Sequence, residues 1–279
     1  MQAVLTRWFK QNKRELPWRD TSPWGVMVSE FMLQQTPVNR VLPIWKQWMS
    51  TWPDPLSLAQ APKSDVIRAW GRLGYPRRAL RLHESAKVIS EKFDNRVPST
   101  YEELLSLPGV GDYTASAILA FAFGQRSLVL DINIRRLFSR SIDGVETPSS
   151  SISQVERALR TNLIPAKNPH LWAVATMEFG ALVCTAKNPN CADCPLQNEC
   201  AWRAAGYPKS EVKPKPTFNG SDRQCRGAIL NVLREQSRAS HQELSLLWPD
   251  ALQFEKGLKT LIADGLIETT GKKSYKLAN

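Results

Sequence analysis

The stretch Leu107-Pro-Gly-Val-Gly-Asp-Tyr-Thr-Ala-Ser-Ala-Ile118 predicts a glycine-rich turn that leads into an apolar helix. Around Gly109 and Gly111 the backbone N–H groups are not covered by side chains, and the helix that follows presents its positive end. A second stretch, Leu130-Asp-Ile-Asn-Ile-Arg-Arg136, places Asp131 at the start of the next helix, where backbone N–H groups would keep its carboxyl ionised. A phosphate-binding turn followed by a fixed carboxylate indicates chemistry on a nucleic acid.

The composition describes a globular protein that favours a polyanionic partner. With 279 residues, 42% of them hydrophobic and 23% charged, the chain can bury a sizeable core and does not resemble a disordered protein. A net charge of +11 favours nucleic acid, because a positive field steers a polyanion and releases its counterions. On charge alone, a basic protein with no such partner remains an alternative. We find no signal-peptide pattern and no apolar run of about 18 residues, so we expect a cytoplasmic protein with no membrane partner.

The chain before residue 205 predicts an all-α core, because helical periodicity recurs there and strand patterns are almost absent. In the helix expected over residues 130–140, Ile134 and Phe138 would face inward. The arginines of that helix would face outward; they are Arg135, Arg136 and Arg140.

A small C-terminal unit is expected after a linker rich in proline and lysine. The linker covers residues 206–222, and the unit covers residues 223–279. Ser240 and Glu243 form a capping-box pattern, and residues 266–277 predict a hairpin after three helices. This order predicts a winged-helix-like α+β module. A packing or dimerisation role is as consistent with it as DNA binding, because its third helix carries only Lys256 and Lys259.

Four of the five cysteines lie in one loop with the spacing C-x6-C-x2-C-x5-C. They are Cys184, Cys191, Cys194 and Cys200. A disulfide is disfavoured in a cytoplasmic protein, and four-cysteine zinc sites usually pair two C-x2-C motifs well apart. The single C-x2-C pair here favours an iron–sulfur cluster but leaves zinc open. Cys225 is expected to be an ordinary thiol.

The hairpin, the following Asp and the cysteine loop, in that order, resemble the helix-hairpin-helix glycosylases of base excision repair, a group that includes endonuclease III. Within that group the chain looks like the adenine DNA glycosylases of the MutY type. The segments that carry the resemblance lie at residues 16–19, 29–36, 71–75, 107–117, 130–136 and 177–180. The resemblance covers about residues 1–205 and implies a two-lobed helical fold, with a six-helix lobe at about 21–125 and an iron–sulfur lobe from 1–20 and 126–205. It also identifies the cysteine loop as a [4Fe-4S] site.

The resemblance assigns roles to two carboxyl groups. From the pattern alone, Glu30 would be a solvated helix carboxylate. By resemblance it would protonate adenine at N7 and later help to activate water, for which it should be enclosed and have a raised pKa. Asp131 would stabilise an oxocarbenium-like sugar or bond to it transiently, with Asn133 and Tyr113 orienting it.

Further positions follow from the same resemblance. Members of the group that also cut the strand carry a lysine just after the hairpin, where this chain has Tyr113, so base removal without strand cleavage is implied. The positions implied to bind DNA or the flipped adenine are Trp18, Arg19, Gln34, Gln35, Tyr75 and Glu178, together with Gly109 and Gly111.

The expected activity is removal of adenine mispaired with 8-oxoguanine or guanine, by a monomer that acts on duplex DNA of the nucleoid. MutY proteins commonly carry a Nudix-like C-terminal domain that reads 8-oxoguanine, and this chain has the winged-helix-like module instead. Two alternatives remain: a thymine glycosylase for T:G mismatches built on the same helices, and a non-catalytic iron–sulfur protein that only binds DNA.

Overall fold

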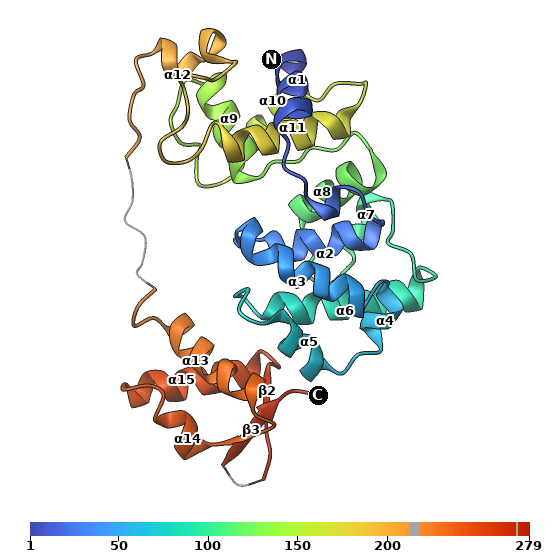
Figure 1. Ribbon diagram of the computed structural model, residues 1–279, viewed down its shortest axis with the longest axis vertical. Coiled ribbons are helices and arrows are strands. Elements are labelled where there is room, and N and C mark those ends of the chain that lie inside the picture. Colours follow the sequence, from blue (N-terminus) through green and yellow to red (C-terminus); the bar gives the residue numbers. More distant parts are fainter. Residues whose placement is uncertain (212–217, 272) are drawn as a thin grey trace. The chain divides into compact units, whose positions relative to one another are not determined.

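A computed structural model describes residues 1–211, 218–271 and 273–279 of the chain (Figure 1). The chain forms two compact units. The first unit comprises Met1–Met27, Ser99–Ser106 and Val110–Lys213, and the second comprises Val28–Pro98, Leu107–Gly109 and Pro214–Asn279. Helix α2 (Pro23–Leu33) begins in the first unit and ends in the second. The domain boundaries expected from the sequence stay predictions.

The described part of the first unit is helical, which confirms the all-α character predicted for the core. Its elements are α1 (Gln2–Asn12), η1 (Pro17–Arg19), α7 (Tyr101–Leu105), α8 (Asp112–Phe123), α9 (Ile132–Ser141), α10 (Gln154–Thr161), α11 (Pro169–Leu182), η2 (Gln197–Glu199) and α12 (Ala201–Ala204).

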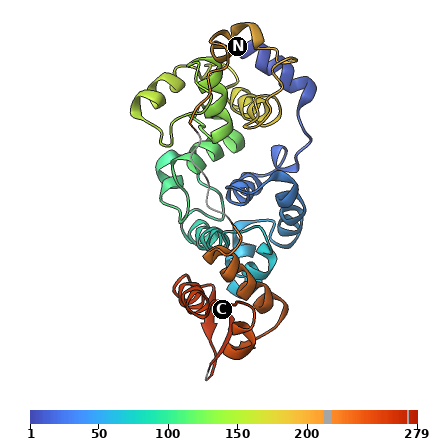
Figure 2. The same ribbon diagram turned by 90° about the vertical axis from the view of Figure 1, so that its left-hand side faces the viewer.

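Helix α11 is the centre of the first unit, and α1, α8 and α9 pack against it. Figures 1 and 2 show α1 beside α11, although the two helices come from opposite ends of the unit's sequence. Phe179 is fully buried and meets the ring of Trp8 edge-on at 4.9 Å, while Trp172 stacks on Phe138 of α9 at 6.0 Å. Such aromatic contacts add to the burial of apolar area. They fix the position of α9, and therefore of Asp131 at its start.

The arginines of α9 are buried, so their predicted outward orientation is wrong. Arg135, Arg136 and Arg140 are at most 7% exposed. The physical reason is that each guanidinium has fixed polar partners: Arg135 pairs with Glu156 at 2.7 Å, and Arg140 donates to the carbonyl of Thr185 at 2.7 Å. A charged side chain can be buried when its N–H groups are satisfied in this way.

Helices also form the first part of the second unit. They are α3 (Val38–Thr51), α4 (Pro55–Ala59), α5 (Lys63–Trp70) and α6 (Arg77–Lys92). Trp48 of α3 lies edge-on to Trp52 at 4.9 Å and to Trp70 of α5 at 5.5 Å. This aromatic cluster holds α3 to α5.

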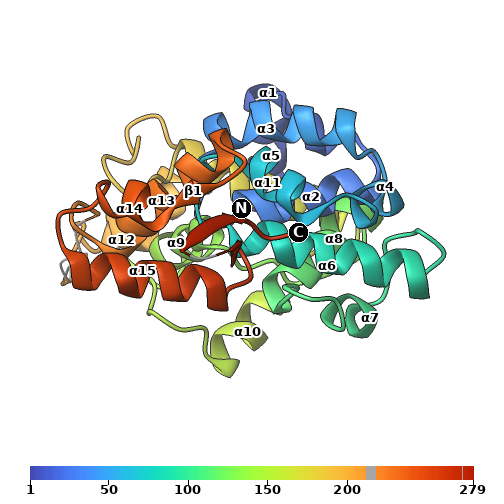
Figure 3. The same ribbon diagram turned by 90° about the horizontal axis from the view of Figure 1, so that it is seen from below.

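The C-terminal module, defined here as residues 221–279, has the helix and strand order of a winged helix (Figures 1 and 3). Its elements are α13 (Asp222–Glu235), β1 (Ala239–Ser240), α14 (His241–Ser245), α15 (Ala251–Ala263), β2 (Ile267–Thr269) and β3 (Ser274–Leu277). The antiparallel sheet has the order β1-β3-β2, with Ala239 opposite Tyr275 and Ile267 opposite Leu277.

The predicted α+β module is confirmed, and two of its details differ from the sequence reading. The capping box of Ser240 and Glu243 is present at the start of α14. The pattern predicts the first helix of the module over Arg226–Glu235, but α13 begins at Asp222, because the Ser221 hydroxyl accepts a hydrogen bond from the N–H of Gln224. The two-residue strand β1 is too short for a periodic signal, and the sequence gives no sign of it.

The module shares one hydrophobic core with α5 and α6. Ile67 of α5 and Leu80 of α6 belong to the same buried cluster as Ile229, Phe254 and Leu277 of the module. Arg234 of α13 also donates to the backbone carbonyl of Ile67 at 3.3 Å. The small unit that the sequence suggests is therefore packed on the preceding helices and is not a tethered domain.

None of the helices in the described residues combines the length and the apolarity needed to cross a membrane.

Gly180 sets the distance between α11 and α9. A Cβ atom at this position would lie 2.6 Å from the carbonyl oxygen of Asn133 and 3.0 Å from its Cβ. Real Cβ atoms do not approach a backbone oxygen this closely, so the absence of a side chain lets the two helices touch.

We expect Gly180→Ala to lower the free energy of unfolding by about 1–3 kcal/mol, because the added methyl group forces α9 away from α11. Denaturant titration would measure it. Gly227→Ala on α13 is the matched control, since a Cβ there meets no atom within 4 Å. It should be neutral or stabilising by up to about 1 kcal/mol. Equal stability of the two variants would contradict the close-contact account.

Candidate active site

The two glycines of the hairpin differ in what a side chain would meet. Gly109 has φ +80°, and a Cβ on it would lie 2.7 Å from the Cβ of Arg81. Gly111 is the N-cap of α8, and the space where its Cβ would stand is empty. The hydroxyl of Ser85 on α6 donates to the carbonyl of Pro108 at 2.6 Å and fixes the turn. The N-terminus of α8 is the positive end of the helix, which is suited to an anion.

Asp112 adds an acid beside this turn, and its charge is matched locally. Its carboxyl accepts hydrogen bonds from Tyr101 and Arg157, both at 2.6 Å. Burial acts to raise the pKa of Asp112, but these hydrogen bonds and the charge of Arg157 outweigh it and lower the pKa. The arginine neutralises the acid, which would otherwise repel a phosphate at the hairpin.

Asp131 caps α9, as predicted. Its Oδ1 accepts from the N–H of Ile134 at 2.7 Å, and its Oδ2 accepts from Nδ2 of Asn133 at 2.6 Å. Asn133 in turn accepts from Arg136 at 2.8 Å through Oδ1. The structure thus brings Asp131 and Asn133 together and adds Arg136, which the sequence reading had placed on the outer face.

The hydrogen bonds of the cap lower the pKa of Asp131, as expected, but the net shift has the opposite direction. Burial is the largest influence and raises the pKa of the Asp131 carboxyl above its ordinary value. Hydrogen bonds from Ile134 and Asn133 and the charge of Arg136 act in the opposite direction without cancelling it. A positive charge that developed next to this carboxyl would favour its ionised form.

Tyr113 is the second residue of α8 and packs, partly buried, against the core of the first unit. Its role as a partner of Asp131 stays a prediction. Ile132, next to Asp131, is 58% exposed and so points away from the core.

Glu178 of α11 is paired with two arginines from the N-terminal segment. Arg14 donates to it from its backbone N–H at 2.8 Å and from Nη2 at 2.6 Å, and Arg19 approaches it to 2.9 Å. Trp18 lies buried beside Arg19 in η1. The three positions implied to line an adenine pocket are therefore grouped in the first unit. Arg14 could not be predicted from the sequence, because its partner lies 164 residues away.

In the second unit, Glu30 is buried, with 6% of its surface exposed, so the solvated alternative is wrong. Gln34 and Gln35 follow α2, and Gln35 has φ +55°. Tyr75 lies in the turn before α6, with φ +46°.

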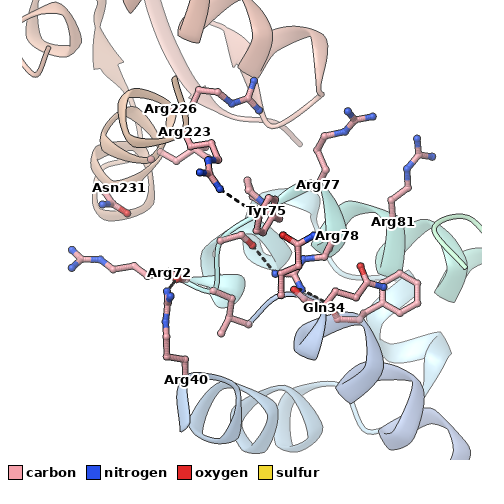
Figure 4. A pocket seen from close by; sticks show the side chains of 18 of the residues that line it. Gln34, Arg40, Arg72, Tyr75, Arg77, Arg78, Arg81, Arg223, Arg226 and Asn231 are labelled. Atoms are coloured by element: carbon pink, nitrogen blue, oxygen red, sulfur yellow. Dashed lines mark hydrogen bonds between the residues drawn. The ribbon is translucent and has the colours of Figure 1, made fainter. Parts of the chain in front are cut away.

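Arg78 of α6, which the sequence analysis did not single out, holds these two turns together. It donates to the carbonyls of Phe31 at 2.8 Å, Gln34 at 2.6 Å and Gly74 at 3.1 Å. Burial lowers the pKa of Arg78 to about 10, so it stays charged at neutral pH. Figure 4 shows its position between the residues of both turns.

The four cysteines of the loop line one small cavity together with apolar side chains such as Phe179 and Leu196. No group of three or more Cys, His, Asp or Glu side chains in the described chain is placed to hold a single metal ion. A cluster of several iron atoms suits four thiols spaced around a cavity. Arg140 lies 3.6 Å from Sγ of Cys184, where its charge would offset that of bound thiolates. These residues fit a [4Fe-4S] cluster, which would join both ends of the loop.

Family models match the two parts of this site. Residues 28–163 match the HhH-GPD superfamily of base excision DNA repair proteins, and residues 184–200 match the iron-sulfur binding domain of endonuclease III. The second match confirms the predicted [4Fe-4S] cofactor.

Known structures share the fold. A thermostable thymine-DNA glycosylase aligns with a TM-score of 0.66 and 25% identity over 73% of this chain and 94% of that one. An endonuclease III–DNA complex aligns with a TM-score of 0.64 and 22% identity over 74% and 94% of the two chains. The predicted helix-hairpin-helix fold is thereby confirmed, and fold and site define a base excision repair protein.

Among base excision repair proteins, the similar sequences are those of adenine DNA glycosylases. The adenine DNA glycosylase of Mycobacterium tuberculosis H37Rv is 45% identical over 95% of this chain and 90% of its own length. That of Mycolicibacterium smegmatis is 42% identical over 98% and 94% of the two chains. The human adenine DNA glycosylase is 40% identical over 71% of this chain but only 38% of its own length. The chain belongs to the adenine DNA glycosylase family of the HhH-GPD superfamily.

We expect Glu178→Gln to lower the free energy of unfolding at pH 7 by about 1–3 kcal/mol, because Arg14 and Arg19 lose a charged acceptor. Burial acts to raise the pKa of Glu178, but hydrogen bonds from Arg14 and the charge of Arg19 lower it. The wild-type advantage is therefore present above the ordinary glutamate pKa of about 4.3 and is lost as pH falls through the lower folded value.

Urea unfolding across this pH range measures the difference. Asp65→Asn, which breaks an exposed pair with Arg68, is the control and should cost less than about 1 kcal/mol. A difference between wild type and Glu178→Gln that stays constant down to pH 2 would refute the charge-pair account.

Substitution of Cys191 by serine should abolish cluster retention, because a four-cysteine site loses one of its ligands. Iron and sulfide analysis and visible absorbance of the purified protein measure this. Cys225→Ala is the control: Cys225 is buried in the core of the C-terminal module and should not affect iron content. Full iron content in the Cys191 variant would rule out Cys191 as a ligand.

Proposed function

We propose that this protein hydrolyses the N-glycosidic bond of adenine mispaired with 8-oxoguanine or guanine in duplex DNA, without cutting the strand. The observation that carries the proposal is the half-buried carboxyl of Asp131, held by Ile134, Asn133 and, through Asn133, by Arg136. The names of the relatives support adenine as the substrate base.

The adenine must leave the duplex before its glycosidic bond can be reached. In this proposal Tyr75 and the Gln34–Gln35 pair hold the opened base stack. Arg78 supports their arrangement, because it binds the backbone of both turns. The hairpin of Gly109 and Gly111 binds the backbone phosphate beside the flipped nucleotide.

Bond cleavage needs an acid for the base and an anion for the sugar. In this proposal the buried Glu30 donates a proton to N7 of adenine and afterwards helps to activate water. As the bond stretches, positive charge develops on the sugar, which favours the ionised form of Asp131. Asp131 then stabilises the oxocarbenium-like sugar or bonds to it transiently, and Asn133 and Tyr113 orient it.

The adenine pocket of this proposal is formed by Trp18, Arg19 and Glu178. The pairing of Glu178 with two arginines supports a fixed position for its carboxylate, which is what selective recognition of a base edge requires. Tyr113 supplies no amine, so no Schiff base with the abasic sugar forms. We propose further that the protein acts as a monomer on nucleoid DNA in the cytoplasm.

The test is a set of duplexes that contain A:8-oxoguanine, A:G or T:G, incubated with the full-length holoprotein and then cleaved at abasic sites with alkali. We expect alkali-dependent breaks at adenine in the first two duplexes and none without alkali. Breaks at T:G alone would identify a thymine glycosylase, and no breaks in any duplex would leave only DNA binding.

Asp131→Asn should lower the single-turnover rate by at least about 100-fold while the affinity for DNA is retained, because Asn still caps α9 but carries no charge. Asp250→Asn is the matched control: Asp250 caps α15 in the same way, accepting from the N–H of Gln253 at 2.9 Å. It should leave the rate unchanged. An Asp131→Asn rate within twofold of wild type would overturn the assigned role.

A further inference from the structure

A cavity of about 930 Å³ lies in the second unit and is strongly cationic (Figure 4). Eight of its lining residues are arginines, and none of the described residues that line it is acidic. One wall is the turn before α6 together with the first residues of α6. The other wall is α13 of the C-terminal module, which contributes Arg223, Arg226 and Arg234.

The arginines of this cavity differ in whether a carboxylate already neutralises their charge. Arg77 and Arg226 both pair with Asp264, at 3.4 and 2.5 Å. Arg40, Arg72 and Arg223 have no carboxylate within salt-bridge distance in the described chain. These three cations, from α3, the turn before α6 and α13, are available to an anion.

Two half-buried arginines of the cavity have lowered pKa values. Burial and the nearby charge of Arg72 lower the pKa of Arg234 to about 10. Burial alone lowers the pKa of Arg78 to about 10, with Tyr75 acting weakly in the opposite direction. An anion bound in the cavity would relieve this repulsion.

Tyr75 stands at the rim of the cavity and is held by one arginine from each wall. Arg223 donates to its hydroxyl at 3.0 Å, and the guanidinium of Arg78 lies 5.5 Å from its ring centroid. The ring is 43% exposed, and its backbone is in the left-handed region that a tyrosine rarely adopts. The bond from Arg223 therefore fixes the direction of an exposed aromatic side chain by way of the C-terminal module.

We infer that the C-terminal module takes part in DNA binding through α13: the cavity receives backbone phosphates of the duplex, and Arg223 is a positioning residue for Tyr75. This inference rests on the proposed function for the part that concerns base opening. Planar guanidinium groups match phosphate oxygens in pairs, and the cavity exceeds the size of one phosphate group. An aromatic ring at the rim suits a nucleic acid, which offers a base next to each phosphate.

The third helix of the module has a smaller part in this arrangement. Lys256 of α15 is bound to Asp222 at 2.7 Å and is thus neutralised. Lys259 is the other cation of that helix and does not line the cavity. The cationic face of the module is consequently its first helix.

The test measures affinity for a mispair-free duplex over a range of salt concentrations, using the full-length holoprotein. We expect Arg223→Ala to weaken binding about 5- to 10-fold and to reduce the slope of log K against log salt by about 0.9, the value for one lost phosphate contact. Lys259→Ala removes the same charge from an exposed position on α15 and should change neither quantity. Thermal unfolding of both variants checks that they fold.

Positioning has a separate readout. A duplex with 2-aminopurine beside the A:8-oxoguanine pair fluoresces more when the base stack opens. Tyr75→Phe keeps the ring but removes the acceptor of Arg223, so we expect it to reduce this rise without changing the salt slope. Arg223→Ala should reduce both, and Arg223→Lys, which keeps a donor and a charge, should restore both in part.

The outcomes separate the two proposals. If wild type excises no adenine but Arg223→Ala still reduces the salt slope, the activity proposal fails and the phosphate contact stands. If Arg223→Ala binds DNA with the affinity and slope of Lys259→Ala, the DNA role of α13 is refuted, whatever the activity. If Tyr75→Phe opens the stack as well as wild type does, Arg223 does not position the ring.

Discussion

The buried guanidinium of Arg136 is the interaction on which the candidate site of the first unit depends. It donates to the carbonyl of Gly180 at 2.6 Å, to the carbonyl of Cys184 at 2.7 Å and to Asn133 at 2.8 Å. Carbonyls at the end of a helix lack partners within it, and a planar group with five N–H donors can satisfy several at once. Through Asn133 this one side chain links the position of Asp131 to the end of α11 and to the first cysteine of the loop.

In the second unit, too, an arginine binds the carbonyls at the end of a helix. Arg78 binds the carbonyls of Phe31 and Met32 near the end of α2 and that of Gln34 just beyond it. In both units a buried arginine occupies the negative end of an apolar helix, where a cation is favoured. The residues implied to contact DNA or substrate therefore stand on turns whose backbone is fixed from inside. Such support gives a site the rigidity that precise placement of reacting groups requires.

What the sequence could predict was local. The hairpin, the Asp131 cap, the capping box of Ser240 and the cysteine spacing each depend on residues close together in the chain, and the structure has all of them. The supporting role of the arginines could not be predicted, because their partners are remote in sequence: 46 residues separate Arg78 from Met32, and 44 separate Arg136 from Gly180. Their polarity also suggested that they lie on the solvent-exposed face of a helix. A single sequence cannot reveal that backbone carbonyls in the interior accept their hydrogen bonds. The net direction of the pKa shift of Asp131 could not be predicted for a related reason, since burial outweighs the cap and depends on packing from distant segments.

The core shared by Ile67, Leu80 and Leu277 has a consequence for the order in which the protein can fold during synthesis. The helices described in the first unit are all translated by Ala204, so its core can assemble while the rest of the chain is still being made. The second unit must wait, because the strand that completes its core is among the last residues to leave the ribosome. Until then the apolar side chains of α5 and α6 that pack against the C-terminal module stay exposed to solvent. The nascent chain can therefore finish the unit that contains the cysteine loop before the unit that contains Tyr75 and the C-terminal module.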